Sequence, residues 1–81
     1  MYIYLIYWGL RMKRKEFYEK FGETILKERR LRKMTRRELS ELLGVQQMTV
    51  YNWEMAKFRI HGLEMLKLIT LFGLDQSELL K

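Results

Sequence analysis

Several residue types that build reactive sites are absent or scarce in this sequence. There is no cysteine, so the chain has no disulfide, no thiolate zinc site and no thiol nucleophile. His61 is the single histidine, and a lone loop histidine without a second metal-binding side chain does not make a metal site. Glycine-rich phosphate-binding loops are also missing. We therefore expect no enzymatic activity, no metal and no cofactor.

Proline is absent too, and the longest apolar run is short. Without proline, bends in the chain depend on glycine and on helix caps. The apolar run over residues 1–10 (MYIYLIYWGL) is far shorter than the roughly 20 residues that a membrane-spanning helix needs. It also lacks the basic start and the cleavage site of a signal peptide. We therefore expect a cytoplasmic protein that does not enter a membrane, which fits the lack of cysteine.

Positive charge is concentrated in the first half of the 81-residue chain. Residues 11–37 hold 12 basic and 4 acidic residues, a balance of +8, whereas residues 38–81 hold 4 basic and 6 acidic residues, a balance of −2. A one-sided basic segment favours a polyanionic partner, either nucleic acid or an acidic membrane surface. On charge alone, a basic helix face that is simply solvated is an equal alternative.

The chain length predicts one domain, over residues 12–81, preceded by an apolar extension of residues 1–11. The tyrosine, isoleucine and tryptophan of this extension favour a β-strand, which must pair or pack because an exposed strand is prone to aggregate. It can therefore act as an arm for a second copy or another partner. Alternatively, native translation begins at Met12, because the codons of Trp8 and Gly9 form a G-rich run where a ribosome-binding site would lie.

Apolar periodicity predicts five helices and an all-α fold for the domain. Phe17, Phe21 and Ile25 recur every four residues in a helical stretch over residues 13–33, in which Gly22 is a candidate break. Capping boxes at residues 35–38 and 75–78 predict the starts of two further helices, and Gly44 and Gly73 predict two helix ends. The helices expected after the first cover residues 36–43, 46–55, 63–72 and a short last segment that includes Leu79 and Leu80.

The segment over residues 44–54 (GVQQMTVYNWE) has the layout of a helix-turn-helix, in which two short helices are joined by a tight turn. In this motif, the N-terminal residues of the second helix meet base edges in the major groove of DNA. Val50 and Trp53 stand at helical spacing and are expected to face the core. The residues left facing outward are then Gln47, Met48, Tyr51 and Asn52, with Thr49 near the edge.

These outward side chains have the chemistry of base recognition. Gln47 and Asn52 can each make a bidentate pair with adenine N6 and N7, and each good pair contributes about 1–3 kcal/mol. Met48 can lie against a thymine methyl group or fill a gap in the core, and Tyr51 can contact DNA or shield the helix. Gln46, at the helix start, suits a phosphate contact. The alternative for the two base-reading amides is a solvated surface.

The order of these signals resembles the Cro/lambda-repressor type of helix-turn-helix domain, also called the XRE family. The similarity runs from about Gly22 to Leu80 and rests on GETILKERRLRKMTRRELSELLGVQQMTVYNWE, followed by LEMLKLITLFGLDQSELL. It implies a compact, five-helix, lambda-repressor-like fold that binds double-stranded DNA.

The resemblance also implies roles for individual residues. Base readers would be Gln47, Met48 and Asn52; phosphate contacts would come from Arg36, Gln46, Lys57 and Arg59; and Arg29 with Glu54 would form a partly buried salt bridge between the first and third helices.

The chain departs from the family pattern after the third helix. This family often has glycine after the Trp-Glu pair and a proline a few residues later, where this chain has Ala56 and Ile60. Because alanine disfavours a positive φ, we expect the third helix to run longer or the loop to take another course. This weakens the inference for Lys57 and Arg59. Gln46 is also a weaker N-cap than serine or threonine.

Three functions are compatible with these observations. The leading hypothesis is a sequence-specific regulator of transcription, a repressor, that inserts the helix over residues 46–55 into the major groove and acts as a homodimer. The alternative is an antitoxin that binds a toxin through residues 1–11 and also binds its own promoter. A third is a binder of acidic membrane surfaces that uses the basic helix near Met12 with the aromatic start.

Overall fold

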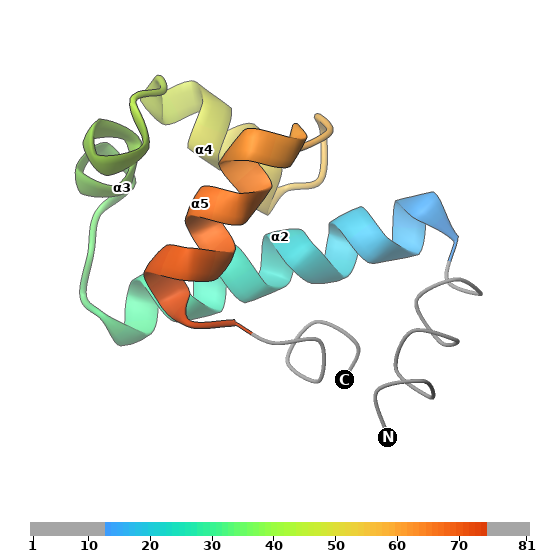
Figure 1. The fold of residues 1–81 in the computed structure, drawn as a ribbon, viewed down its shortest axis with the longest axis horizontal. Helices are drawn as coiled ribbons and strands as arrows, with labels where there is room; N and C mark the ends of the chain where they lie inside the picture. The colour runs from blue at the N-terminus through green and yellow to red at the C-terminus, as the bar shows by residue number, and fades with distance from the viewer. Residues whose placement is uncertain (1–12, 75–81) are drawn as a thin grey trace.

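Residues 13–74 are described by the structure, a computed structural model, and they form four helices (Figure 1). These are α2 (Arg14–Leu31), α3 (Arg36–Leu43), α4 (Gln47–Glu54) and α5 (Gly62–Phe72). No strand occurs between residues 13 and 74, in agreement with the all-α class predicted from the sequence. The expected strand or arm over residues 1–11, through which a toxin would bind, and the expected last helix lie outside the described residues.

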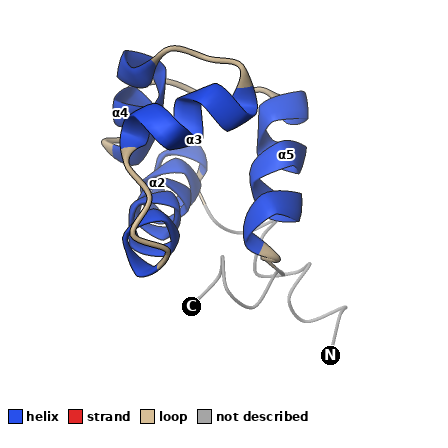
Figure 2. Cartoon of the chain, turned by 90° about the vertical axis from the view of Figure 1, so that its left-hand side faces the viewer, coloured by secondary structure: helices blue, strands red, loops and turns tan. Residues whose placement is uncertain are grey.

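The helices surround one apolar core to which each of them contributes. In Figure 1, α2 runs along the base, α3 and α4 lie together above it, and α5 crosses in front; the turned view in Figure 2 separates α5 from the α3–α4 pair. The buried apolar residues are Phe21, Ile25, Leu39, Leu43, Val50, Trp53, Ile60, Leu68, Phe72 and Leu74. Burying each large side chain contributes roughly 1.5–3 kcal/mol, so this cluster is the main stabilising element of a small domain.

Gly22 does not break α2, which runs without interruption through it, so the candidate break was wrong. Gly22 is buried, and a Cβ atom built there would lie 2.5 Å from the carbonyl oxygen of Trp53 and 2.8 Å from that of Glu54. The absence of a side chain therefore lets the C-terminal end of α4 approach the backbone of α2. Here glycine serves a helix–helix contact rather than a bend.

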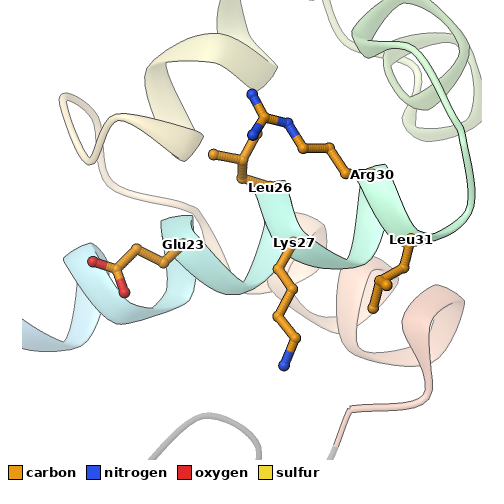
Figure 3. Close-up of a pocket in the computed structure, with 5 residues that line it drawn as sticks. All are labelled: Glu23, Leu26, Lys27, Arg30 and Leu31. Atoms are coloured by element: carbon orange, nitrogen blue, oxygen red, sulfur yellow. The ribbon is translucent and has the colours of Figure 1, made fainter.

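The side of α2 opposite its buried residues Phe21, Gly22 and Ile25 faces away from the core. Glu23, Leu26, Lys27, Arg30 and Leu31 line a shallow hollow on it, and Lys27 points away from α4 (Figure 3). Charges of both signs alternate with apolar side chains on this face.

The start of α3 is held by the predicted capping box. The Glu38 carboxylate accepts a hydrogen bond of 2.9 Å from the backbone N–H of Thr35, and the Thr35 hydroxyl accepts one of 3.1 Å from the backbone N–H of Glu38. Hydrogen bonding to the carboxyl group by the backbone of Thr35 first, and by its side chain second, lowers the pKa of Glu38 from its ordinary value. The helix ends at Gly44, whose φ of +72° turns the chain directly into α4.

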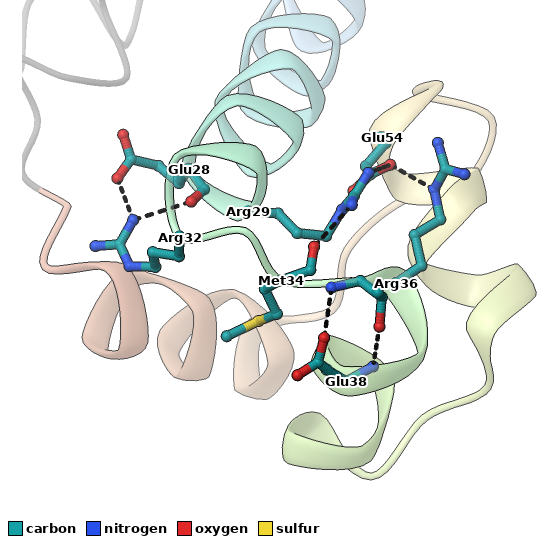
Figure 4. Close-up of polar contacts among 8 residues, drawn as sticks. Glu28, Arg29, Arg32, Met34, Arg36, Glu38 and Glu54 are labelled. Carbon is teal, nitrogen blue, oxygen red and sulfur yellow. Dashed lines mark hydrogen bonds and ion pairs between the residues drawn. The ribbon is translucent and has the colours of Figure 1, made fainter.

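An arginine joins the end of α2 to the end of α5. Arg32 donates a hydrogen bond of 3.2 Å to the carbonyl oxygen of Phe72, and its guanidinium carbon lies 4.8 Å from the centre of the Phe72 ring. Glu28 holds the same arginine from one helical turn away, at 2.6 Å (Figure 4). This contact fixes α5 against α2 at the base of the core.

The helix α4 stops at Glu54, and Ala56 adopts a left-handed conformation with φ of +56°. Of the two alternatives expected at Ala56, a longer helix was therefore wrong. The backbone N–H of Lys57 donates to the carbonyl oxygen of Asn52 at 2.8 Å, which closes the helix end in the way that glycine usually permits. Burial of Ile60 anchors the chain beyond this turn. The hydrogen bond from Lys57 and the burial of Ile60 offset the cost of the left-handed conformation, which is about 1–2 kcal/mol.

Among the helices of residues 13–74, none combines the length and the apolar character needed to cross a bilayer.

Replacing Gly22 with alanine should destabilise the fold. Alanine normally favours a helix over glycine by about 1 kcal/mol, but here the added methyl group meets two backbone carbonyls that cannot rotate away. We expect a net loss of roughly 1–2 kcal/mol in the free energy of unfolding, measured by urea denaturation. The control is Gly62→Ala, which places its methyl group in open space and should leave the midpoint unchanged or raise it. Equal midpoints for the two variants would contradict the close approach of α4 to α2.

Replacing Ala56 with glycine should stabilise the fold. Glycine removes the penalty of the positive φ but loses more entropy on folding, so a net gain of about 0.5–1 kcal/mol is expected. Thermal melts followed by circular dichroism would measure it. Lys57→Gly is the neighbouring control: its φ is not positive, so this variant should melt at the same or a lower temperature. A lower melting temperature for Ala56→Gly would argue against the strained turn.

Candidate nucleic-acid interface

The outward face of α4 carries the side chains that the helical spacing placed there. Gln47 and Met48 are exposed, the latter to 63%, while Asn52 and Tyr51 are partly exposed. Thr49 is also partly exposed and lies toward the loop that follows α4, where it lines a shallow hollow with Phe58 and Arg59 among others. The first turn of α4 therefore presents an amide and a thioether to solvent.

The inward face of α4 fixes the position of this surface. Val50 is fully buried and Trp53 nearly so, and both belong to the apolar core. Because these side chains cannot leave the core without large loss of stability, the outward side chains keep their direction relative to α2 and α3. Gln46, at the start of α4, makes no side-chain cap, which leaves its exposed amide group available to a ligand.

The buried carboxylate of Glu54 joins three helices at the end of α4 (Figure 4). The structure places Nε of Arg29 2.6 Å from Oε2 of Glu54, and Nη2 of Arg29 3.3 Å from Oε1. Nε of Arg36 lies 2.8 Å from the same Oε1. A second contact, from Nη1 of Arg29 to the carbonyl oxygen of Met34 at 2.9 Å, orients the guanidinium.

The position of this carboxylate explains why it needs both arginines. The Glu54 side chain has no exposed surface and that of Arg29 is 9% exposed, so the charges compensate each other rather than being screened by water. Arg36 is more accessible, at 35%, and its remaining N–H groups can reach a partner. Within residues 13–74, every buried polar side-chain atom has a hydrogen-bond partner. The result is a rigid connection of α4 to α2 and α3.

Tyr51 brings two of the predicted phosphate ligands together. The guanidinium carbon of Arg36 lies 5.1 Å from the centre of its ring, and Nζ of Lys57 lies 5.3 Å from it. Both distances are those of cation–π contacts, which are electrostatically favourable. The aromatic ring therefore holds one cation from α3 and one from the loop after α4 beside the outward face.

The remaining predicted phosphate ligand, Arg59, is exposed in the same loop as Lys57. Gln46 lies at the N-terminal end of α4, whereas Arg36 and Lys57 lie beside Tyr51 in the C-terminal half of α4. A positive or hydrogen-bonding group on each side of a helix matches the two phosphate backbones that border a groove.

Two features of this site were not anticipated from the sequence. Arg36 pairs with Glu54 as well as standing on the surface, and Tyr51 positions two cations. Neither follows from spacing along the chain, because 18 residues separate Arg36 from Glu54. His61 is exposed, and no group of three or more metal-binding side chains occurs in the part of the chain that the structure describes.

Removing the Glu54 carboxylate should be strongly destabilising. Glu54→Ala leaves two arginines next to each other, one of them buried, so we expect a loss of about 3–5 kcal/mol in the free energy of unfolding. The matched control is Glu41→Ala, which removes an exposed carboxylate 3.2 Å from Arg37 and should change stability by less than about 0.5 kcal/mol. Urea denaturation of both variants measures the difference. Similar midpoints for the two would mean that the buried pairs contribute no more than the surface pair.

Comparison with known proteins agrees with this geometry. The family model HTH_3, described as helix-turn-helix, matches residues 25–79, which is more than half of the chain and includes α3, the turn at Gly44, α4 and α5. Neither a curated protein nor a solved structure matches the chain. The chain therefore belongs to the Cro/lambda-repressor (XRE) family of helix-turn-helix DNA-binding domains.

Proposed function

We propose that this protein is a sequence-specific transcriptional repressor that reads double-stranded DNA with α4 in the major groove. The observation that carries the proposal is a short helix with two opposed faces. One face is locked in the core by Val50 and Trp53 and by the buried Glu54, and the other presents Gln47, Met48 and Asn52. A reading helix that is already rigid loses little entropy when it binds.

Base recognition is assigned to the first turns of α4. Gln47 and Asn52 each offer a donor and an acceptor on one planar group, which matches the N6 and N7 edge of adenine. Met48 offers an apolar surface to a thymine methyl group. Thr49 and Tyr51, at the edges of the same face, would make the flanking contacts.

Affinity is assigned to the phosphate ligands around α4. Arg36, Lys57 and Arg59 carry positive charge beside the reading face, and Gln46 adds an uncharged contact at the helix start. Each cation that neutralises a phosphate releases a counterion, so binding should weaken steeply as salt increases.

A homodimer on a two-fold operator is part of the proposal. One α4 covers only a few base pairs, whereas two copies on half-sites about 34 Å apart would provide the specificity that a regulator needs. The groove between α3 and α5 supports this part of the proposal. The exposed Leu42, Leu66 and Leu71 line it, an apolar surface of the kind that a second copy covers. Such a protein works in the cytoplasm and needs no catalytic activity.

Removal of the two amides should reduce discrimination between DNA sequences. Duplexes selected from a random pool by the wild-type protein would be compared with random duplex in mobility-shift titrations. Gln47→Ala combined with Asn52→Ala should lose at least about tenfold in affinity for the selected duplex, because each amide pair contributes about 1–3 kcal/mol, and little for random duplex. Sedimentation of the wild-type complex gives the number of copies bound.

The control for this experiment is Glu23→Asp, a charge-conserving change at an exposed residue of the α2 hollow that lies away from the core, and it should leave both affinities unaltered. Equal affinity of the wild-type protein for selected and random duplexes would refute specific readout by α4.

A further inference from the structure

A second basic surface lies next to the reading helix, where the beginning of α2 meets the loop after α4. It is a hollow lined by Arg14, Lys15, Tyr18, Ala56, Lys57, Phe58 and Arg59. Four of these seven residues are cationic and none is acidic. Figure 1 shows the loop that follows α4 on the same side of α2 as α4 itself. Only Lys57 and Arg59 have a role in the function proposed above.

The four cations of this hollow carry charge that the described residues do not neutralise. Arg14, Lys15, Lys57 and Arg59 are all exposed, and none forms an ion pair with another residue between 13 and 74. The arginines at positions 29, 32, 36 and 37, by contrast, each hold a carboxylate. Four unpaired cations around one concavity repel each other unless an anion binds there.

The hollow is continuous with the reading face of α4. Lys57 belongs to both, because its Nζ also lies 5.3 Å from the centre of the Tyr51 ring on α4. Positive charge therefore extends from Arg36 across Tyr51 and Lys57 to the first turn of α2. Because each DNA strand carries a phosphate about every 3.4 Å along the helix axis, a duplex held by α4 continues past its reading site as a further row of negative charge.

We propose that Arg14 and Lys15, together with Lys57 and Arg59, bind the DNA backbone outside the base pairs that α4 reads. The inference rests on the proposed function and extends its footprint along the duplex. The ligand is a phosphodiester backbone, so this contact adds affinity without adding sequence preference. Phe58, which is 60% exposed at the edge of the hollow, offers an apolar wall to the deoxyribose between phosphates.

An experiment on duplex length separates this contact from general attraction by charge. The protein variant Arg14→Ala with Lys15→Ala would be compared with wild type on the selected duplex, on random duplex, and on a selected duplex trimmed to the base pairs that α4 requires. The double variant should bind the two long duplexes roughly three- to tenfold more weakly, and the slope of log affinity against log salt should fall by about 2. Trimming should weaken wild type more than the double variant, which retains only Lys57 and Arg59 of the four cations.

The matched control is Lys27→Glu, which lowers the net charge by the same two units on the face of α2 that points away from α4 (Figure 3). It should keep the wild-type salt slope and the wild-type loss on trimming. Circular dichroism and urea denaturation should show all three proteins equally folded, because the substituted side chains are exposed.

Three outcomes would overturn the proposal. They are an equal fall in salt slope for Lys27→Glu and the double variant, an undiminished loss on trimming for the double variant, and an effect of the double variant on binding to anionic phosphatidylserine vesicles but not to DNA. Failure of wild type to prefer the selected duplex is a different result: it would refute the reading role of α4, while the backbone contact would still be measured on long and short random duplexes.

Discussion

The buried carboxylate of Glu54 is the interaction on which the arrangement of the helices depends. It accepts hydrogen bonds from Arg29 of α2 and from Arg36 of α3 while it sits at the last residue of α4. A carboxylate without exposed surface is tolerated only when its charge is compensated, so the three helices can assemble in one way that satisfies it. The close approach at Gly22 reinforces this arrangement, because it brings the carbonyl oxygens of Trp53 and Glu54 against the backbone of α2.

The same network connects stability to recognition. Arg36 holds Glu54 through its Nε atom, and its guanidinium carbon lies 5.1 Å from the centre of the Tyr51 ring, so one residue links the buried frame to the outward face. Lys57 makes the second cation–π contact with the Tyr51 ring, and it extends the positive charge into the hollow near Arg14. The helix α4, which we propose reads DNA, is thus flanked by cations whose positions are set by the fold, and its outward face itself carries uncharged amides.

Much of the local structure could be predicted because it depends on neighbours in the chain. The capping box of Thr35 and Glu38, the left-handed Gly44 and the inward spacing of Val50 and Trp53 each involve residues a few positions apart. The expected helix break at Gly22 and the expected helix extension at Ala56 were wrong because both were inferred from the intrinsic conformational preference of the residue. Gly22 lies inside a helix to allow a contact with residues more than thirty positions away, and Ala56 accepts a positive φ because a backbone hydrogen bond and the burial of Ile60 offset the strain.

The sequence by itself therefore determined the four helices between residues 13 and 74, the turn at Gly44 and the amide-rich outward face of α4, since helical periodicity and capping act over one or two turns. Apart from the Arg29–Glu54 pair, which the family resemblance implied, only the tertiary structure decided which distant charges meet. Arg36 lies 18 residues from Glu54, and Arg14 and Lys15 are more than forty residues from Lys57, yet packing brings each set together. Electrostatic contacts act through space over a few ångströms, so spacing along the chain indicates pairs one helical turn apart but not pairs between distant residues, which depend on how the helices pack.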